Sequence, residues 1–460
     1  MTTALRHQVE LELRDVSASD PWETIRRGSR LISRKVGLIR EIAETRHQAQ
    51  DPVVFTEGVL LSDFSRCVRD GQALNAGGAG DNAAVALVSA IGEAAERHCA
   101  CFPDRDDMVF GAFHELADDA VSPDHLRLFS REQIERFGPR DPVYFDDRSR
   151  IRWVWGYSLS ERRPRLVPAS LVYLNYRPEG GEANIGLNAS TGLAAGATRE
   201  EAILSALLET VERDAFTVAW MHRQAGRRID IDDDELQRVL RVQLWADRPS
   251  VDVKFFDLTT DIPIPVVFIV MRRRAEFGPV VCLGAASRLS PRQAVRKCIQ
   301  EGGQNFPFIR SLLASAKDWQ PAPDFSNLIS FDFHFLTYLK CPDLVAPAFA
   351  FFDECDDRVA LRQLPDRSTG RVLADLDYCV ACLGQAGYEV IVTDITTPDI
   401  AEIGLSVVRV IVPGLVPLHG NHLRPFLGAR RLFEVPRRLG WDRRGWSPES
   451  GLNPLPHPFP

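Results

Sequence analysis

The stretch Ser89-Ala-Ile-Gly-Glu-Ala-Ala-Glu-Arg97 recurs later in the chain as Ser205-Ala-Leu-Leu-Glu-Thr-Val-Glu-Arg213. Both copies have the form Ser-Ala-x-x-Glu-x-x-Glu-Arg. At about 100° per residue, the two glutamates and the arginine of each copy share one helix face, while apolar residues occupy the other. The repeat therefore predicts two amphipathic helices, over about residues 82–101 and 198–223.

Glycine-containing segments precede both helices, and we predict each to be a loop, over residues 74–81 and 186–196. The second helix begins with Thr198-Arg-Glu-Glu201, which has the pattern of a capping box. A third helix, over about residues 291–305, carries Lys297, Glu301 and Gln304. A third acidic helix of this kind is a weak signal by itself, but it extends the pattern of the first two.

Two interpretations of the repeated carboxylates remain open on the residues alone. A solvated helix face with local ion pairs, worth a few tenths of a kcal/mol each, explains either copy by itself. If the copies face each other, four carboxylates converge and repel one another unless cations lie between them. Mg²⁺ suits such a site, because it binds a few carboxylates and completes its octahedron with water and phosphate oxygens. Arg97 and Arg213 would then bind phosphate in bidentate fashion.

Strands and helices outside the repeat predict an α/β or α+β fold with helices packed on sheets. Strand patterns occupy residues 251–256, 264–271 and 280–284. The last third alternates helix and strand, and the four expected elements are residues 371–385, 389–394, 398–403 and 406–412.

Length and composition exclude several classes of protein. The chain has 460 residues, 45% hydrophobic and 26% charged, as in an ordinary globular protein. A net charge of −8 without a basic stripe does not support nucleic-acid binding. The nine cysteines favour free thiols over a disulfide framework. Because no apolar run is long enough to span a membrane and no secretory signal begins the chain, we expect a cytoplasmic protein.

The motifs together resemble the YcaO superfamily. Its two Ser-x-x-x-Glu-x-x-Glu-Arg helices correspond to the repeat, and its Glu-x-x-Gln element corresponds to residues 301–304. Residues 190–215 and 388–418 are similar to its central and C-terminal blocks, so the resemblance covers roughly residues 30–460. It implies a YcaO-type fold with mixed sheets packed by helices, and it implies ATP and Mg²⁺ as cofactors.

The resemblance also implies roles for individual residues. Five glutamates would hold metal: Glu93, Glu96, Glu209, Glu212 and Glu301. Cofactor-binding residues would be Ser89, Arg97, Glu201, Arg213 and Lys297, and Gln304 would be a catalytic residue of the same shell. The chain departs from many relatives at Ala79 and Ala197, where lysine and asparagine are common. These departures leave the phosphate contacts open.

The chain ends in Pro454-Leu-Pro-His-Pro-Phe-Pro460. A proline-rich terminus is commonly a frayed end. Azoline-forming members of the superfamily end in Pro-x-Pro-x-Pro, and the resemblance implies that Pro456, Pro458 and Pro460 reach the active site as catalytic residues. Proline favours a stiff extended rod, which would place the terminal carboxylate with little loss of entropy.

Other candidate sites are weaker. Cys379 and Cys382 have metal-ligand spacing, but they lie on a predicted helix with no second pair, which favours the core. Cys99 and Cys101 end the first carboxylate helix and are interpreted as structural. His419-Gly-Asn-His422 follows a strand and either forms a structural loop or lines a pocket.

By resemblance, the chain is expected to be an ATP-dependent cyclodehydratase that forms thiazoline or oxazoline in a ribosomal precursor peptide. We expect a short extension over residues 1–50, a catalytic domain over 51–453 and a tail over 454–460. A separate ThiF-like or leader-binding protein would recognise the substrate, a flavin-dependent dehydrogenase would oxidise the product, and the chain would form a homodimer. Two alternatives stay open: thioamide or amidine formation, and a non-catalytic docking subunit.

Overall fold

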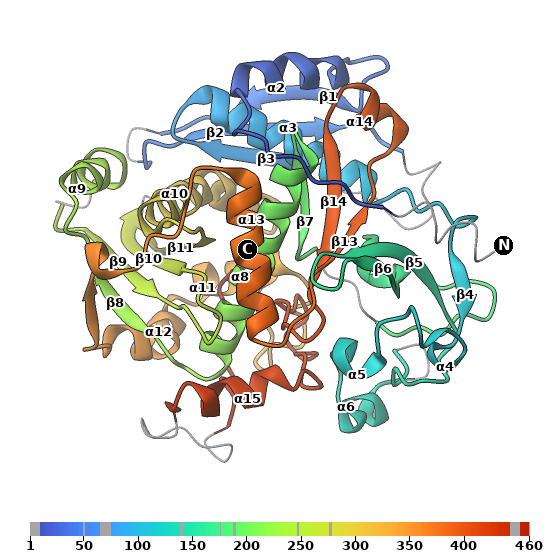
Figure 1. Cartoon of the computed structure of the whole chain (residues 1–460). Helices are drawn as coiled ribbons and strands as arrows, with labels where there is room; N and C mark the ends of the chain where they lie inside the picture. Colours follow the sequence, from blue (N-terminus) through green and yellow to red (C-terminus); the bar gives the residue numbers. More distant parts are fainter. Residues whose placement is uncertain are drawn as a thin grey trace.

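The computed structural model describes residues 10–48, 51–64, 75–138, 142–174, 176–186, 190–245, 248–275, 278–441 and 451–459. Within these residues the strands form three sheets, and long helices pack on them (Figure 1). The predicted class is confirmed. The prediction of mixed sheets holds for one sheet, where strand β12 pairs in parallel with β8, whereas the strand pairs of the other two sheets are antiparallel.

The first sheet has the order β1-β2-β3, with β1 at Ile39–Glu44, β2 at Phe55–Leu61 and β3 at Asn75–Gly80. Helix α2, at Pro21–Gly28, begins at the N-cap Asp20 and packs beside it. Because β1 pairs with β2, a boundary at residue 50 divides this sheet. Residues 39–44, which the sequence analysis assigns to the N-terminal extension, form one strand of this sheet.

The second sheet has six strands in the order β4-β5-β13-β14-β7, with β6 paired to β5. Its strands are β4 Val109–Gly111, β5 Ile151–Ser158, β6 Arg163–Pro168, β7 Leu193–Gly196, β13 Ile391–Asp394 and β14 Ser406–Ile411. Strands from the first half of the chain thus pair with strands from its last fifth. This long-range pairing brings the C-terminal block next to the glycine segment before the second carboxylate helix.

The third sheet has the order β11-β10-β9-β8-β12. Its strands are β8 Arg227–Asp230, β9 Val251–Asp257, β10 Val266–Ala275, β11 Gly278–Ser287 and β12 Arg358–Ala360. Strand β10 is almost completely buried, and its apolar run Val266–Met271 is typical of a strand covered on both faces.

Helices cover these sheets in the described chain (Figure 1). The longer ones are α3 Ala83–Cys99, α8 Arg199–Met221, α10 Pro291–Ser315, α11 Phe331–Lys340, α12 Val345–Asp353 and α13 Val372–Gln385. The shorter ones include α4 Phe113–Leu116, α5 Pro123–Leu126, α6 Arg131–Arg136, α7 Ala169–Val172, α9 Asp234–Val239, α14 Pro398–Glu402 and α15 Arg431–Arg438.

All the elements predicted from the sequence are present, but three details differ. The two segments predicted as glycine loops contain strands β3 and β7. Helix α10 continues past Asn305 and through Pro307 to Ser315. Proline costs a helical hydrogen bond, but burial of Phe306, Ile309 and Leu312 on one face of the extra turns offsets this cost.

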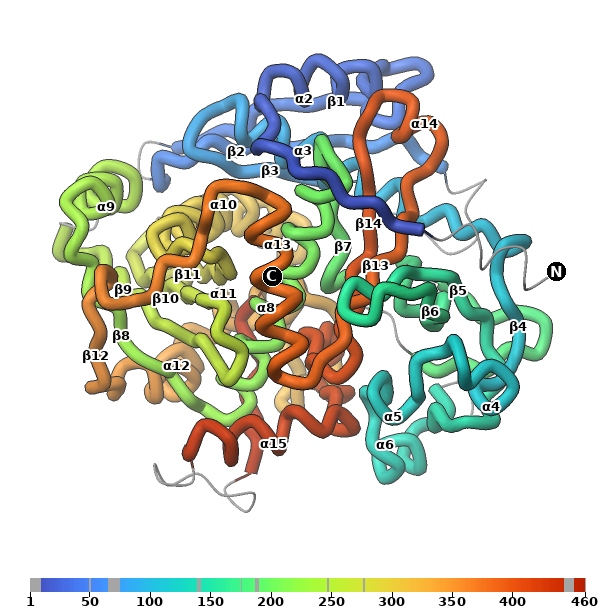
Figure 2. Tube along the Cα trace, in the orientation of Figure 1, coloured from blue at the N-terminus to red at the C-terminus, as the bar shows by residue number. Residues whose placement is uncertain are grey.

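Helix α8 lies at the centre of the molecule, where it contacts β7 and β14 on one side and β10 and β11 on the other. The predicted amphipathic pattern holds only for its first half. From Thr210 to Met221 almost every residue is buried, because two sheets cover the helix. The N-terminal segment crosses the beginning of α8 (Figure 2), and Arg14 N–H donates to Glu200 there, at 2.7 Å.

Among the described residues, no single helix has both the length and the apolar content needed to cross a membrane. The bent pair Phe331–Lys340 and Pro342–Asp353 passes that test by length and composition only.

Candidate functional site

Three strand-and-helix units, β3–α3, β7–α8 and β11–α10, carry the predicted glutamates. In each unit a strand glycine lets the helix backbone approach closely. A Cβ atom on Gly78 would lie 2.3 Å from both the Ala86 oxygen and the Ala90 nitrogen. A Cβ atom on Gly284 would lie 2.8 Å from the Cβ of Glu301. These glycines serve close packing on a strand, which explains why the segments are not loops.

Each of the five glutamates accepts a hydrogen bond from a backbone N–H in a strand or directly beside one. In α3, Glu93 accepts from Gly77 of its own strand at 2.8 Å. Glu96 instead accepts from Ala195 of β7, the strand of the next unit, also at 2.8 Å. One helix thereby joins two units.

Helix α8 repeats this arrangement one unit further along. Glu209 accepts from Gly192, which precedes β7, at 3.1 Å. Glu212 accepts from Ser287 of the following strand, β11, at 3.2 Å. Glu301 of α10 closes the series by accepting from Ala285 of β11 at 3.3 Å. In both α3 and α8, the first glutamate thus binds at its own strand and the second binds the strand of the next unit, so the sequence repeat is also a structural repeat.

The carboxylates influence one another, which a solvated helix face would not produce. The pKa of Glu96 is raised to about 8, mainly by burial and also by the nearby charges of Glu93 and Glu209. Burial likewise raises the pKa of Glu212, with Glu301 as the next cause. Burial also raises the pKa of Glu209. These mutual effects show that carboxylates from all three helices lie close together in a partly buried region.

Cations of the same helices face the carboxylates. Arg97 donates to Glu93 at 2.5 Å. Arg213 lies 3.7 Å from Glu209 and 3.5 Å from Glu212, and Lys297 lies 3.5 Å from Glu301. The latter contacts are longer than hydrogen bonds, so these oxygens keep room for a further ligand.

The C-terminal tail runs along α8 in the antiparallel direction. Asn453 N–H donates to the Met221 oxygen at 2.7 Å, and the Leu455 oxygen accepts from the Trp220 indole at 3.3 Å. Phe459 then packs on Phe216, with ring centres 4.5 Å apart. The tail is thus ordered against the core rather than frayed, and it approaches the second glutamate motif. Pro460 lies outside the described residues.

Comparison with known sequences gives the decisive observation. The family model described as YcaO cyclodehydratase, ATP- and Mg²⁺-binding, matches residues 77–416.

The chain belongs to the YcaO family.

ATP and Mg²⁺ are therefore its cofactors. An uncharacterised protein of Methanothermobacter thermautotrophicus is 27% identical over 362 residues, which are 77% of this chain and 85% of that protein. A solved structure described as a heterocyclase in complex with substrate and cofactor is 27% identical, with a TM-score of 0.79 over all of this chain. The chain spans 60% of the length of that heterocyclase.

The YcaO-type fold is confirmed by these likenesses. YcaO from Methanopyrus kandleri, bound with AMPPCP and Mg²⁺, is 24% identical and has a TM-score of 0.61, covering 88% of this chain and 94% of that one. It supports the fold alone.

The glutamates of this YcaO chain fit a Mg²⁺ site. Each carboxylate is oriented by one backbone N–H, and several keep an oxygen facing a cation at more than hydrogen-bond distance. Among the residues that the structure describes, no group of three or more His, Cys, Asp or Glu side chains could hold a metal ion by itself. Mg²⁺ needs only one or two of these carboxylates, because waters and substrate phosphates complete its coordination.

The other predicted site residues lie at varied distances from this cluster. Ser89 and Gln304 are half-buried, one helical turn from Glu93 and Glu301 respectively. Glu201 accepts hydrogen bonds from Thr198 and Ser19, which makes it the predicted capping box residue. These contacts do not support its expected place among the cofactor-binding residues, because both of its oxygens are engaged.

Three charged residues near the glutamates are not predicted from the sequence. Arg409 of β14 is 2% exposed, donates to the Ser190 oxygen at 2.7 Å and is influenced by Glu209. Burial lowers its pKa to about 10. Arg288 follows β11 and affects Glu212, and Asp332 of α11 is influenced by Arg97. The available signal for Arg409 is a charge inside the apolar run Ser406–Val412.

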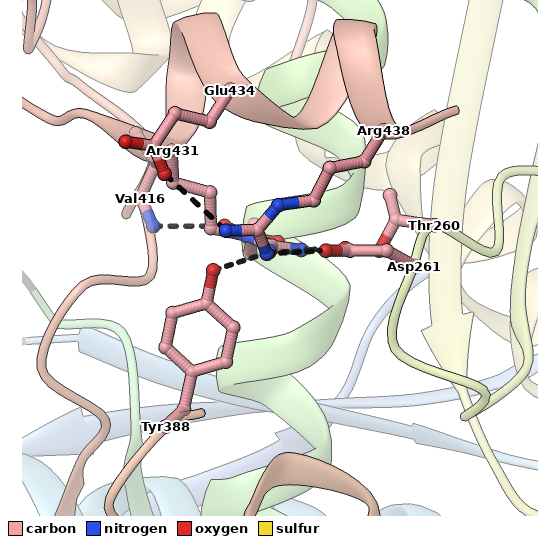
Figure 3. Close-up of polar contacts among 8 residues, drawn as sticks. Thr260, Asp261, Tyr388, Val416, Arg431, Glu434 and Arg438 are labelled. Carbon is pink, nitrogen blue, oxygen red and sulfur yellow. Dashed lines mark hydrogen bonds and ion pairs between the residues drawn. The ribbon is translucent and has the colours of Figure 1, made fainter. Parts of the chain in front are cut away.

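Behind the cluster, a buried ionic network connects α8 to α15 (Figure 3). Asp214, which is fully buried, accepts from Arg431 at 2.8 Å and from the Val416 N–H at 2.9 Å. Arg431 also donates to Asp261 at 2.8 Å and to the Tyr388 hydroxyl at 2.8 Å. Burial lowers the pKa of Arg431, but Asp214 and Asp261 outweigh it and hold the pKa above its ordinary value.

The weaker candidates have structural surroundings. Cys379 and Cys382 are buried and belong to the core, as predicted. Cys99 contacts Thr397 at 3.3 Å, and its thiol pKa is raised by burial to about 11. The pocket interpretation of the His419–His422 loop is supported, because both histidines line a cavity of about 230 Å³.

Proposed function

We propose that this YcaO protein is an ATP-dependent cyclodehydratase that forms thiazoline or oxazoline rings in a ribosomal precursor peptide. One observation carries the proposal. The tail approaches the glutamate motif of α8, and the Phe459 ring packs over Arg213 with 4.9 Å between the ring centre and the guanidinium carbon. This contact supports a role for the tail at the nucleotide site, as expected of the ring-forming members.

In the proposed reaction, a Cys, Ser or Thr side chain of the peptide attacks the carbonyl carbon before it. The resulting tetrahedral oxygen takes the terminal phosphoryl group of ATP and leaves as phosphate when the ring C=N bond forms. The peptide therefore loses the elements of one water, and ATP becomes ADP and phosphate.

The chain's own residues would act mainly by position and charge. Arg97, Arg213 and Lys297 would bind phosphate oxygens, which places positive charge where negative charge develops. Glu93, Glu96, Glu209, Glu212 and Glu301 would hold Mg²⁺, which neutralises the phosphates. The strand N–H bonds orient these carboxylates in advance, so little reorganisation accompanies binding.

The tail would supply orientation. Pro456 and Pro458 are buried and keep the chain extended toward Arg213. Pro460, the third proline predicted to be catalytic, would orient the peptide amide. Gln304 would assist from α10.

The heterocyclase with substrate and cofactor is longer than this chain, which spans 60% of it. We propose that a separate leader-binding or ThiF-like protein supplies substrate recognition, that a flavin-dependent dehydrogenase can follow, and that the YcaO protein acts as a homodimer.

The test combines the protein, Mg·ATP, the partner and the precursor peptide encoded with it, and uses mass spectrometry of the peptide. Loss of one water per modified residue supports the proposal. Replacement of oxygen by sulfur indicates thioamide formation instead. Absence of both ATP hydrolysis and mass change with an authentic substrate leaves the docking subunit, which Ala79 and Ala197 suggest, as the remaining function.

Two variants sharpen this test. Deletion of residues 456–460 is expected to abolish ring formation while Mg·ATP still binds. Glu212→Gln is expected to reduce Mg·ATP affinity, whereas Glu41→Gln on the exposed edge of β1 serves as the matched control. Full ring formation by the truncated chain would refute the role of the tail.

A further inference from the structure

Four histidines from three parts of the chain gather around the tail. His457 of the tail stacks on His334 of α11, with ring centres 4.0 Å apart and planes 20° apart. His419 lies 5.1 Å from His457, and His422 lies 5.8 Å from His334. His334 and His457 are 0% and 1% exposed. We call these four residues the histidine cluster. The proposed reaction assigns no role to their side chains.

Hydrogen bonds fix how His457 sits in the cluster. Its Nε2 donates to the His419 oxygen at 2.7 Å, because a carbonyl can only accept. Its own carbonyl accepts from His334 Nδ1 at 3.1 Å. The Tyr338 hydroxyl donates to the neighbouring Pro456 oxygen at 2.5 Å. His457 is therefore held by three contacts: its ring stacks on His334, its Nε2 binds the His419 oxygen, and its carbonyl binds the His334 ring.

The cluster is not a metal cage. Within the described ranges, no group of three His, Cys, Asp or Glu side chains is arranged to hold a metal ion. Burial is the largest cause that lowers the pKa of His334, to about 4, and of His419, to about 3. Burial also lowers the pKa of His457. The rings are thus neutral packing and hydrogen-bonding groups.

The sequence of the tail creates a problem of register that this histidine can solve. Residues 454–460 alternate proline with Leu455, His457 and Phe459. A slip of two residues along α8 superposes proline on proline, and proline has no N–H to mark a position. Asn453, just before these residues, fixes where the tail begins through its bonds to the Met221 and Trp220 oxygens. Beyond Asn453, only the three intervening side chains distinguish one register from another. Leu455 and Phe459 are both apolar, which leaves His457 as the one polar marker among them.

We propose that His457 is a positioning residue that sets the register of the tail on α8, so that Phe459 meets Arg213. This inference rests on the proposed function for its catalytic meaning. In a register shifted by two residues, leucine or phenylalanine occupies the place of His457. The buried His419 oxygen then loses its donor, and leaving a buried acceptor without its hydrogen bond is costly.

The experiment measures register directly, without substrate. A 4-fluorophenylalanine replaces Phe459, and ¹⁹F NMR counts the environments of this ring. The unaltered tail is expected to give one main resonance. His457→Leu is expected to give at least two, with the original population reduced roughly tenfold relative to the others, as expected for the loss of one buried hydrogen bond. Hydrogen exchange of the peptide 451–460 is expected to accelerate in parallel.

Two further variants make the result specific. His457→Gln keeps a donor within reach of the His419 oxygen and is expected to restore most of the original resonance. His222→Leu is the matched control, because His222 is 4% exposed and donates its Nε2 to the Leu432 oxygen at 2.6 Å, away from the histidine cluster. It is expected to lower stability without dividing the fluorine signal.

Two outcomes overturn the inference. One is a single, unshifted fluorine resonance in His457→Leu, and the other is the same number of resonances in His222→Leu as in His457→Leu. If His457→Leu does not fold, a divided signal in His457→Gln also counts against it, since a donor alone should keep the register. If the register scatters while ring formation persists, the proposed role of the tail in the reaction fails and the register assignment stands.

Discussion

The guanidinium of Arg213 lies over the ring of Phe459, 4.9 Å from its centre. The same guanidinium faces Glu209 and Glu212, so one arginine links the acid cluster to the end of the tail. Phe459 is 4% exposed and cannot leave this place without uncovering apolar surface. A change of charge on Glu209 or Glu212 should therefore alter the contact between Arg213 and Phe459. A displacement of Phe459 should in turn alter the contacts of Arg213 with these glutamates.

Phe459→Leu keeps an apolar side chain and removes the aromatic ring. We expect the free energy of unfolding to fall by about 1–3 kcal/mol, because both a cation–π contact and an edge-to-face ring pair are lost. Urea denaturation measures this loss. Phe308→Leu, at a ring that is 38% exposed on α10, is the control. An equal loss of unfolding free energy in both variants would show that the ring contacts of Phe459 add nothing beyond its apolar burial.

The raised carboxyl pKa values predict that Mg²⁺ binding releases protons. Without metal, Glu96 has a pKa of about 8 and is mostly protonated at pH 7. Because the folded pKa lies above the unfolded value of about 4.5, the stabilising contribution is complete at low pH. It is lost as the pH rises through about 8. The free energy of unfolding of the metal-free protein should fall as the pH rises from about 4.5 to about 8, and added Mg·ATP should restore it.

Calorimetric titration with Mg·ATP in buffers of different ionisation enthalpy measures the released protons. Glu96→Gln should remove close to one proton from the count, whereas Glu41→Gln should leave it unchanged. A heat of binding that does not depend on the buffer would show that the carboxylates are already ionised.

The sequence predicts the helices that carry the glutamates because the 3.6-residue periodicity and the capping box are local features. Helix α8 begins at Arg199 with its N-cap at Thr198, as the capping box indicates. Strands β3 and β7 are not predicted, since their glycines are typical of turns. They are strands because each pairs with a neighbouring strand. Their glycines are needed because a helix backbone packs directly on them, as at Gly78.

The part of the site that the sequence could not predict depends on distant pairing. Arg409 reaches the cluster because β14 pairs with β7, over two hundred residues earlier in the chain. The partners of Asp214 lie at residues 416 and 431, and no local pattern marks them. The repeat alone left the convergence of the glutamates open, and the resemblance to a family is what predicted it.

Arg431→Met should strongly destabilise the protein, by about 3–5 kcal/mol, because it leaves the buried Asp214 carboxylate without its cationic partner. The double variant Asp214→Asn with Arg431→Met should recover part of this loss, since neither charge is then unpaired. Chemical denaturation of the single and double variants measures the coupling. Arg438→Met, at a half-exposed member of the same network, should cost little. Additive effects of the two changes would contradict a coupled pair.

The histidine cluster predicts acid sensitivity of the tail. The folded pKa of His334 is about 4, below the unfolded value of about 6.5, so its stabilising contribution is complete above about pH 6.5. It is lost as the pH falls toward about 4. Exchange of the peptide 451–460 should therefore accelerate in this range before the rest of the chain opens. In His334→Phe, which cannot be protonated, this acceleration should be smaller, and an unchanged pH profile would exclude the cluster as its cause.

The close approach of strand and helix makes Gly78→Ala a severe change. Its Cβ would lie 2.3 Å from the Ala86 oxygen and the Ala90 nitrogen, both backbone atoms that cannot rotate away. We expect α3 to move outward, which lengthens the Gly77–Glu93 hydrogen bond and weakens Mg·ATP binding at least tenfold together with a loss of stability of about 1–3 kcal/mol. Gly384→Ala in α13 is the matched control, because nothing lies within 4 Å of the added carbon. That variant should be more stable by about 0.5–1 kcal/mol, as alanine favours a helix over glycine. Titration calorimetry and thermal unfolding compare the two, and wild-type affinity in Gly78→Ala would show that the spacing of β3 and α3 does not control the position of Glu93.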